Sequence, residues 1–173
     1  MKKIIIIMTI LTTILIYTEI RNNEVVIPNN AIRLRVIPNS NSITDQNMKN
    51  KVKEYLEKST YLELKDISDI NEARNKINSS MNNINYNINK IFAENKYDTK
   101  YKINFGYNYF PEKKYRGLKY EAGYYESLVI TIGKGEGDNW WCVLFPNLCL
   151  ADLEDMNDIE LKSWLLEQIN KIF

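Results

Sequence analysis

The sequence predicts an α+β fold: a single domain with three helices on one face of a largely antiparallel sheet of about four strands, after an N-terminal membrane-targeting segment. The first observation is size, because 173 residues with 45% hydrophobic and 26% charged residues are enough for one globular core. The second is the order of the periodic segments, which is strand, two helices, three strands and helix. The third is an apolar segment at the amino terminus, separated from the remaining chain by a polar stretch.

The apolar N-terminal segment has the features of an export signal. Two lysines precede an apolar run from Ile4 to Tyr17, and Glu19 and Arg21 end it. A helix of about 14 residues covers only about 21 Å, less than the roughly 30 Å of a hydrocarbon core, which favours a signal peptide. No A-x-A cleavage site follows, so an uncleaved anchor stays open. We expect residues 1–20 to be a signal peptide or membrane anchor and the chain from about Arg21 to lie outside the cytoplasm.

The folded domain is expected to span residues 31–173, after a polar, asparagine-rich linker at residues 21–30. Its first strand lies between Ala31 and Ser42 and is stopped by Pro38. Apolar and basic residues alternate along it, which is typical of a strand with one solvent-facing side. The apolar residues are Ile32, Leu34 and Val36, and the basic residues are Arg33 and Arg35.

Two helices are predicted next. Ser42 and Asp45 have the S-x-x-D spacing of a helix cap, which predicts a helix from about Ile43 to Lys58. Its outer, solvated face carries Lys49, Lys51 and Lys53. Ser68 is the expected cap of the second helix, whose apolar residues recur at spacings of three and four and are expected to be core. They are Ile70, Ala73, Ile77, Met81, Ile84, Ile88 and Ile91.

Alternating apolar residues predict two further strands, at Tyr101–Phe110 and Tyr124–Ile132, and an aromatic and β-branched run predicts a third at Trp140–Phe145. A last helix is expected from about Met156 to Ile172. Because the strands follow the helices rather than alternating with them, the sheet is expected to be largely antiparallel.

The segment from Ile132 to Cys149 is unusually dense in glycine and aromatic residues. Its alternating glycines lack the Lys-Ser/Thr pair and the following helix of a phosphate-binding loop, so they indicate a tight turn between strands. Strand alternation places Trp140 and Trp141 on opposite faces. Either loops from Asn108 to Tyr124 cover the second face and bury both tryptophans, or one stays partly exposed as an anchor for a partner.

Several function classes are disfavoured by composition. The chain has no histidine, which removes Ser-His-Asp and Cys-His catalysis and an ordinary zinc site of imidazoles. The carboxylates are scattered and form no evident acid and base pair. A formal net charge of +1 gives no global attraction to nucleic acid. We therefore expect a protein that is not an enzyme and has no metal or cofactor.

The two cysteines, Cys142 and Cys149, are candidates for a disulfide, because export would place them in an oxidising compartment. A plain hairpin turning at Pro146 would leave Cys142 about 7 to 8 Å from Cys149, beyond the usual bridging range of about 4.4 to 6.8 Å. A bulge or a non-hairpin path would close that gap. The alternative is two small buried hydrophobic residues.

Three blocks, in the same order from about Ala31 to Ala151, resemble the stage II sporulation protein R family of endospore-forming bacteria. They are RLRVIPNSNSITDQNMKNKVK, EAGYYESLVITIG and GKGEGDNWWCVLFPNLC. The last block is the most specific, because it joins Asn139 and two tryptophans to both cysteines. Pro38, Glu121 and Val129 depart from the residues usual in the family.

The resemblance implies an intercompartmental signal. Such proteins are made in the forespore, are secreted into the intermembrane space facing the mother cell, and activate a membrane-embedded aspartic protease that processes a pro-sigma factor. The alternatives are a cell-wall hydrolase with Cys142 as nucleophile, and an exported structural or adhesion module. Candidate partner-binding residues in the blocks are Arg33, Arg35, Asn39, Asp45, Gln46, Gly133, Gly135, Gly137, Asn139, Trp140 and Trp141.

Overall fold

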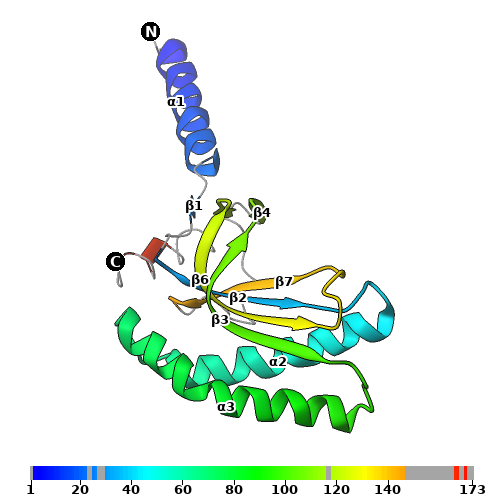
Figure 1. The fold of residues 1–173 in the computed structure, drawn as a ribbon. Coiled ribbons are helices and arrows are strands. Elements are labelled where there is room, and N and C mark those ends of the chain that lie inside the picture. The colour runs from blue at the N-terminus through cyan, green and yellow to red at the C-terminus, as the bar shows by residue number, and fades with distance from the viewer. Residues whose placement is uncertain are drawn as a thin grey trace.

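The computed structural model describes residues 2–22, 25–26, 30–115, 118–146, 166–167 and 170 (Figure 1). Its helices are α1 (Lys2–Asn22), α2 (Ile43–Leu64) and α3 (Ile70–Glu94). Its strands are β1 (Val25–Val26), β2 (Ile32–Ile37), β3 (Tyr101–Phe110), β4 (Lys113–Tyr115), β5 (Leu118–Tyr120), β6 (Gly123–Ile132) and β7 (Trp140–Phe145). These elements confirm the α+β class. The helix predicted at residues 156–172 lies almost wholly outside the described residues.

The main sheet has four strands in the order β3-β6-β2-β7. The β3–β6 and β2–β7 pairs are antiparallel, whereas β2 and β6 are parallel, so the sheet is mixed. A second, three-stranded sheet has the order β1-β5-β4 and was not predicted. Its strand β1 lies inside residues 21–30, the segment predicted as a linker, and pairs with β5.

Both long helices begin at capped residues. The Ser42 side chain accepts a hydrogen bond from the Asp45 backbone N–H, which confirms the predicted cap of α2. The cap of α3 is Asp69 and not the predicted Ser68, because the Asp69 carboxylate accepts from two backbone N–H groups of the first turn. Helix α2 also continues to Leu64, beyond the predicted end at Lys58, since Thr60 and Leu64 extend its buried stripe.

The main hydrophobic core lies between the sheet and helices α2 and α3, which cover the same face (Figure 1). Alternate residues of β2 and β6 face this layer, and the isoleucine stripe of α3 packs onto them, as the period of 3.6 predicts. The fully buried members include Ile32, Leu34, Val52, Leu56, Ala73, Ile88, Leu128 and Ile130.

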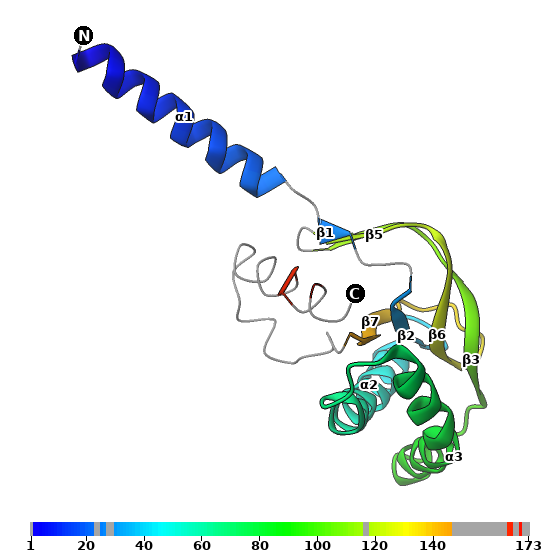
Figure 2. The same cartoon turned by 90° about the vertical axis from the view of Figure 1, so that its left-hand side faces the viewer.

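The opposite face of the sheet is covered by the distal part of the β3–β6 hairpin, which arches away from the helices toward β5 and β1 (Figure 2). Phe110, Tyr125 and Val129 form a second buried cluster there. The expectation that Arg33 lies on a solvent-facing side is therefore wrong, because this cluster covers it and leaves it 1% exposed. An alternating pattern shows that two faces differ, but not that the polar one is wet.

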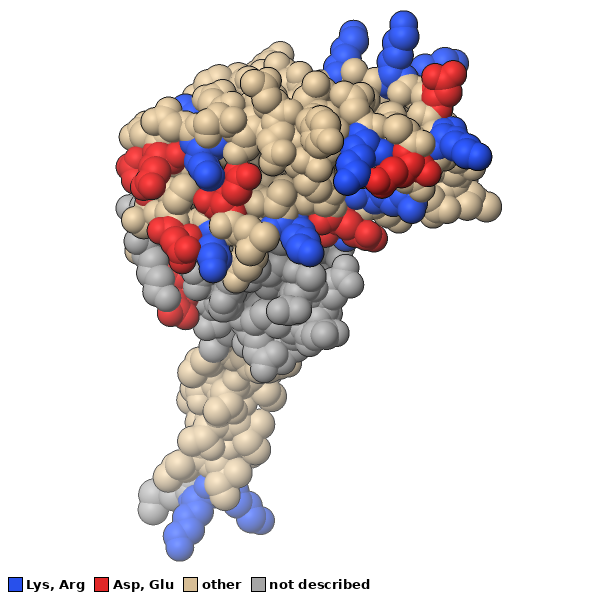
Figure 3. Space-filling model, turned by 90° about the horizontal axis from the view of Figure 1, so that it is seen from below, with Lys and Arg blue, Asp and Glu red and all other residues tan. Residues whose placement is uncertain are grey.

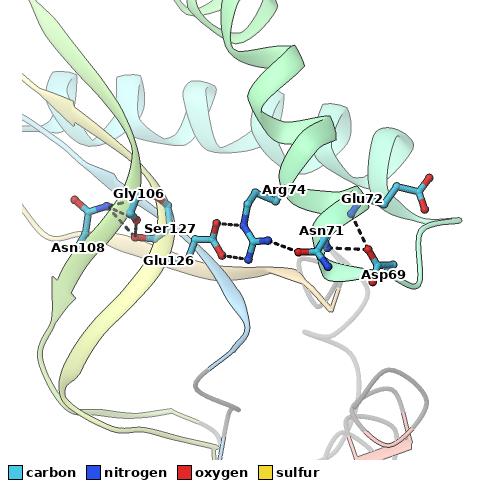
Figure 4. Close-up of polar contacts among 8 residues, drawn as sticks. All are labelled: Asp69, Asn71, Glu72, Arg74, Gly106, Asn108, Glu126 and Ser127. Carbon is cyan, nitrogen blue, oxygen red and sulfur yellow. Dashed lines mark hydrogen bonds and ion pairs between the residues drawn. The ribbon is translucent and has the colours of Figure 1, made fainter.

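An ion pair fastens α3 to the hairpin at the end of the helix layer (Figure 4). Arg74 donates from Nε and Nη2 to the two carboxylate oxygens of Glu126, at 2.5 and 2.8 Å, and from Nη1 to Asn71 at 2.7 Å. Hydrogen bonding to Glu126 raises the pKa of Arg74. A fork of this kind fixes both distance and orientation.

Helix α1 extends away from the domain (Figure 2). The large apolar side chains between Ile4 and Tyr17 are 53–65% exposed. Seen from the helix side, the described side chains of α1 form an uncharged extension with lysines at its far end, while basic and acidic side chains are interspersed over the domain (Figure 3). Among the described residues, no helix has the combined length and hydropathy needed to cross a membrane.

Candidate functional site

Two loops meet at one end of the main sheet. The first follows β2 and spans residues 38–42, and the second, residues 133–139, joins β6 to β7. The Asn39 side-chain oxygen accepts from the Lys134 N–H at 3.0 Å, and its backbone carbonyl accepts from the Glu136 N–H at 3.2 Å. The Gly137 N–H donates to the Pro38 carbonyl at 3.2 Å. We call these two segments the paired loops.

The alternating glycines permit this close approach. Gly133 has φ +56°, a left-handed conformation, and a Cβ there would lie 2.2 Å from the Asn39 side-chain oxygen. At Gly137 a Cβ would lie 2.2 Å from the Ser40 backbone oxygen. The predicted tight turn is confirmed, but it also packs against a second loop, a contact that turn chemistry alone did not indicate.

Asp45, in the first turn of α2, is the centre of the hydrogen bonds around the first loop. Its carboxylate accepts from Ser40 Oγ at 2.6 Å, Asn39 Nδ2 at 2.9 Å and the Tyr97 hydroxyl at 2.5 Å. The bonds from Ser40 and Tyr97 are the main reason that its pKa falls to about 2. Asp45 is also 7% exposed, so its role here is structural: it holds the loop to the helix.

Gln46 and Lys49 extend the same network along α2. Gln46 Nε2 donates to the Ser40 carbonyl at 3.1 Å and to the Asn41 side chain at 3.0 Å. Asn41 in turn accepts from the Asp138 N–H, and Lys49 Nζ donates to the Asp138 carbonyl at 3.2 Å. Lys49 is therefore half-buried against the second loop rather than fully solvated, because the loop reaches over the start of α2.

Asn139 connects the paired loops to the sheet. With its amide oriented to satisfy both its donor and its acceptor, it accepts from Arg35 Nη2 at 2.6 Å and Nε at 3.1 Å. It also donates to the Gly137 carbonyl at 3.0 Å. Arg35 is thus held in a fixed orientation at the entrance to β7.

The two tryptophans lie on opposite faces of β7, as alternation predicts. Trp140 is half-buried against the main core, with Lys53 Nζ 5.5 Å from its ring centroid. Trp141 is half-buried against the second cluster and meets Phe110 edge-to-face at 5.3 Å. Phe145 departs from the predicted alternation and joins the main core, because the β2–β7 register shifts between Ile32 and Arg33.

Positive and aromatic side chains gather on the sheet face opposite the helices. The Arg33 guanidinium lies 3.3 Å from the Tyr125 ring centroid, and Arg35 lies 5.4 Å from that of Trp141. Lys113 Nζ lies 4.8 Å from the same tryptophan ring, on the exposed side. Burial lowers the pKa of both arginines. We call this surface the basic aromatic face, made of Arg33, Arg35, Phe110, Lys113, Tyr125 and Trp141.

The predicted site residues therefore fall into three groups. The paired loops bring most of them together: Asn39, Asp45, Gln46, Gly133, Gly135, Gly137 and Asn139. Arg33, Arg35 and Trp141 lie on the basic aromatic face, and Trp140 lies on the helix side. The pair Cys142–Cys149 is not tested, because Cys149 lies outside the described residues.

Sequence reasoning missed Asn41, Tyr97, Phe110, Lys113 and Tyr125. Tyr97 lies in the turn after α3 and reaches Asp45 only through the tertiary fold. Phe110 and Tyr125 lie on the side of their strands that faces away from the helices. The alternation of side chains along each strand could have predicted this position from the sequence. No group of three His, Cys, Asp or Glu side chains suited to a metal occurs within the residues that the structure describes.

Comparison with known proteins places these features in a family context. Residues 28–155 match the family described as Stage II sporulation protein R. Stage II sporulation protein R of Bacillus subtilis (strain 168) is 40% identical over 134 residues, which cover 78% of this chain and 60% of that protein. The chain therefore spans less than two thirds of the length of this curated relative. No solved structure matches.

Proposed function

Because the chain belongs to the stage II sporulation protein R family, we propose that it is an exported signal that activates a membrane-embedded aspartic protease during endospore formation. The activated protease then processes an inactive pro-sigma factor in the mother cell. The family match supports a role in sporulation. The protease, its activation and the location in the intermembrane space are parts of the proposal.

The observation that carries the proposal is the apolar surface of α1. Its large apolar side chains are more than half exposed, and none belongs to the hydrophobic clusters found among the described residues. An apolar surface of this size is unstable in water and is typical of a segment recognised by an export pathway or held at a membrane. An export segment joined to a sporulation domain is the arrangement that an intercompartmental signal needs.

Surface chemistry supports a signal over an enzyme. The chain has no histidine, which removes the usual base of a serine or cysteine nucleophile. Cys142 is also half-buried against the main core, on the helix-facing side of β7. A protein ligand needs only a rigid, complementary surface, and the paired loops and the basic aromatic face are the candidates for it.

Reconstitution tests the proposal directly. The protease is inserted into vesicles with its extracytoplasmic side outward and its pro-sigma substrate inside, and the full chain is added outside. We expect processing of the substrate only when the chain is present. Processing is measured as a change in the electrophoretic mobility of the pro-sigma factor. A heat-denatured chain is the control.

Two other results would contradict it. Release of soluble fragments from purified peptidoglycan by the chain alone would indicate a cell-wall hydrolase. Tight binding to peptidoglycan or vesicles without any processing would indicate a structural or adhesion module.

A further inference from the structure

The sheet face opposite the helices contains buried hydrogen-bond donors that have no acceptor. All three guanidinium nitrogens of Arg33 are buried without a hydrogen-bond partner, and so is Nε1 of Trp141. Arg33 is 1% exposed, so solvent does not compensate. All of these unpaired groups are hydrogen-bond donors, and those of Arg33 also carry a positive charge. The face is therefore short of acceptors and of negative charge.

The surrounding rings compensate only part of that deficit. The Arg33 guanidinium lies 3.3 Å from the Tyr125 ring centroid and 5.6 Å from the centroids of Phe110 and Tyr120. Cation–π contacts stabilise a charge by about 0.5 to 2 kcal/mol, whereas burying an unpaired ion costs several kcal/mol. Arg33 consequently projects a positive potential through a region of low dielectric toward the rim of the face.

Two more cations lie at that rim without a carboxylate. Arg35 is half-buried and Lys113 is exposed, and both approach the Trp141 ring, at 5.4 and 4.8 Å. None of the ion pairs within the described residues includes Arg33, Arg35 or Lys113. Asn139 fixes the orientation of Arg35, so this guanidinium is pre-organised and loses little freedom on binding an anion.

We propose that the basic aromatic face docks an acidic segment of a partner protein, with a carboxylate received between Arg35 and Lys113 beside the Trp141 ring. A carboxylate supplies acceptors without donors and negative charge, which are the two properties the face lacks. Arg33 acts from beneath by its charge. The identification of the partner as the protease rests on the proposed function, whereas the chemistry of the ligand rests on the face alone.

The arrangement favours a protein segment over a lipid surface. Anionic membranes attract clusters of flexible, exposed lysines. Here one arginine is fully buried, a second is held by Asn139, and both rim cations approach one half-buried tryptophan ring. Arginine and tryptophan in a half-buried, ordered setting are typical of energetic centres of protein interfaces.

A peptide titration tests the ligand chemistry without the protease. The full chain, labelled with ¹⁵N in its tryptophan indoles, is titrated with hexaglutamate, with hexalysine and with phosphatidylglycerol vesicles. We expect hexaglutamate alone to shift the Trp141 indole resonance, with an affinity that falls about tenfold or more between 50 and 300 mM salt. Lys113→Glu should abolish the shift, whereas Lys51→Glu, on the exposed side of α2, should retain it.

The vesicle assay then asks whether the face is used in signalling. We expect Lys113→Glu and Arg35→Gln to reduce protease activation about tenfold or more, and Lys51→Glu to leave it unchanged. The Lys113 side chain is exposed and takes part in no ion pair within the described residues, so this variant stays informative if Arg35→Gln unfolds. A Trp141 resonance unmoved by hexaglutamate, a shift caused by the vesicles instead, or full activation by Lys113→Glu would each overturn the inference. Failure of the wild-type chain to activate would instead overturn the proposed function, and the titration would still decide the inference.

Discussion

Gly137 lies so close to the loop after β2 that it leaves no room for a side chain. A Cβ at this position would lie 2.2 Å from the Ser40 backbone oxygen, which cannot move without disturbing the paired loops. We expect Gly137→Ala to lower the free energy of unfolding by about 1 to 3 kcal/mol. Gly106→Ala is the matched control, because a Cβ there meets nothing within 4 Å. Equal urea midpoints for the two variants would show that the paired loops can move apart at Gly137 without loss of stability.

Asp45 makes the stability of the domain depend on pH in the acid range. Its folded pKa of about 2 lies below the ordinary aspartate value of 3.8, mainly because Ser40 and Tyr97 donate to its carboxylate. A depressed pKa contributes stability that is complete above about pH 4 and is lost as the pH falls toward 2.

The variant Asp45→Asn should remove this contribution. We expect it to lower the free energy of unfolding at pH 7 by about 1 to 3 kcal/mol, since hydrogen bonds to a charged group are replaced by weaker ones. Its stability should then vary less than that of the wild type between pH 4 and pH 2, measured by urea unfolding at each pH. A parallel loss in both proteins would assign the acid sensitivity to other carboxylates.

At the scale of elements, β7 separates a structural tryptophan from a surface one. Trp140 packs against the main core between sheet and helices, whereas Trp141 lies at the edge of the smaller cluster beside two cations. We expect Trp140→Ala to cost about 3 kcal/mol of unfolding free energy and Trp141→Ala clearly less. Activation of the protease by the folded protein should fall only in Trp141→Ala. If both variants were stable and active, β7 would be neither core nor contact.

The junction of α3 with the hairpin depends on Arg74 and Glu126. Their side chains are 35% and 13% exposed and form a two-bond fork, so the pair is partly shielded from solvent. We expect a double-mutant cycle with alanine to give a coupling energy of about 1 kcal/mol, after allowance for screening. The exposed pair Lys90–Glu94, at 3.9 Å, should give less than about 0.5 kcal/mol. A coupling energy near zero for Arg74–Glu126 would mean that packing alone joins the two elements.

At the scale of the whole molecule, the apolar helix α1 should direct the domain out of the cytoplasm. Aspartate at the centre of an inserting helix costs about 2.5 to 3.5 kcal/mol, so Ile6→Asp with Ile7→Asp should block export. The readout is digestion by a proteolytic enzyme added outside intact cells, from which a chain retained in the cytoplasm is protected. The control, Ile6→Leu with Ile7→Leu, keeps the segment apolar and should be exported normally. Activation of the protease by a chain retained in the cytoplasm would contradict the proposed topology.

The sequence predicted most elements of the fold because each carries its own local pattern. The alternation in β2, β3 and β6, the apolar run of β7 and the isoleucine stripe of α3 gave their positions to within a few residues. The S-x-x-D spacing gave the start of α2. Short strands such as β1, β4 and β5 were missed, since two or three residues are too few to display a period and their pairing is non-local.

The candidate site was predicted as a set of residues but not as an arrangement. The sequence alone determined the α+β class, the exposed apolar segment as an export candidate, the turn glycines and the opposite faces of Trp140 and Trp141, because these follow from neighbours in the chain. Only the tertiary structure decided that Arg33 is buried, that Asn39 meets Gly133 and that Arg35 and Lys113 share one tryptophan. The physical reason is that burial and charge pairing depend on which segments pack together. A strand shows by its alternation that it has two faces, but what covers the second face is determined by a hairpin about 75 residues farther along the chain.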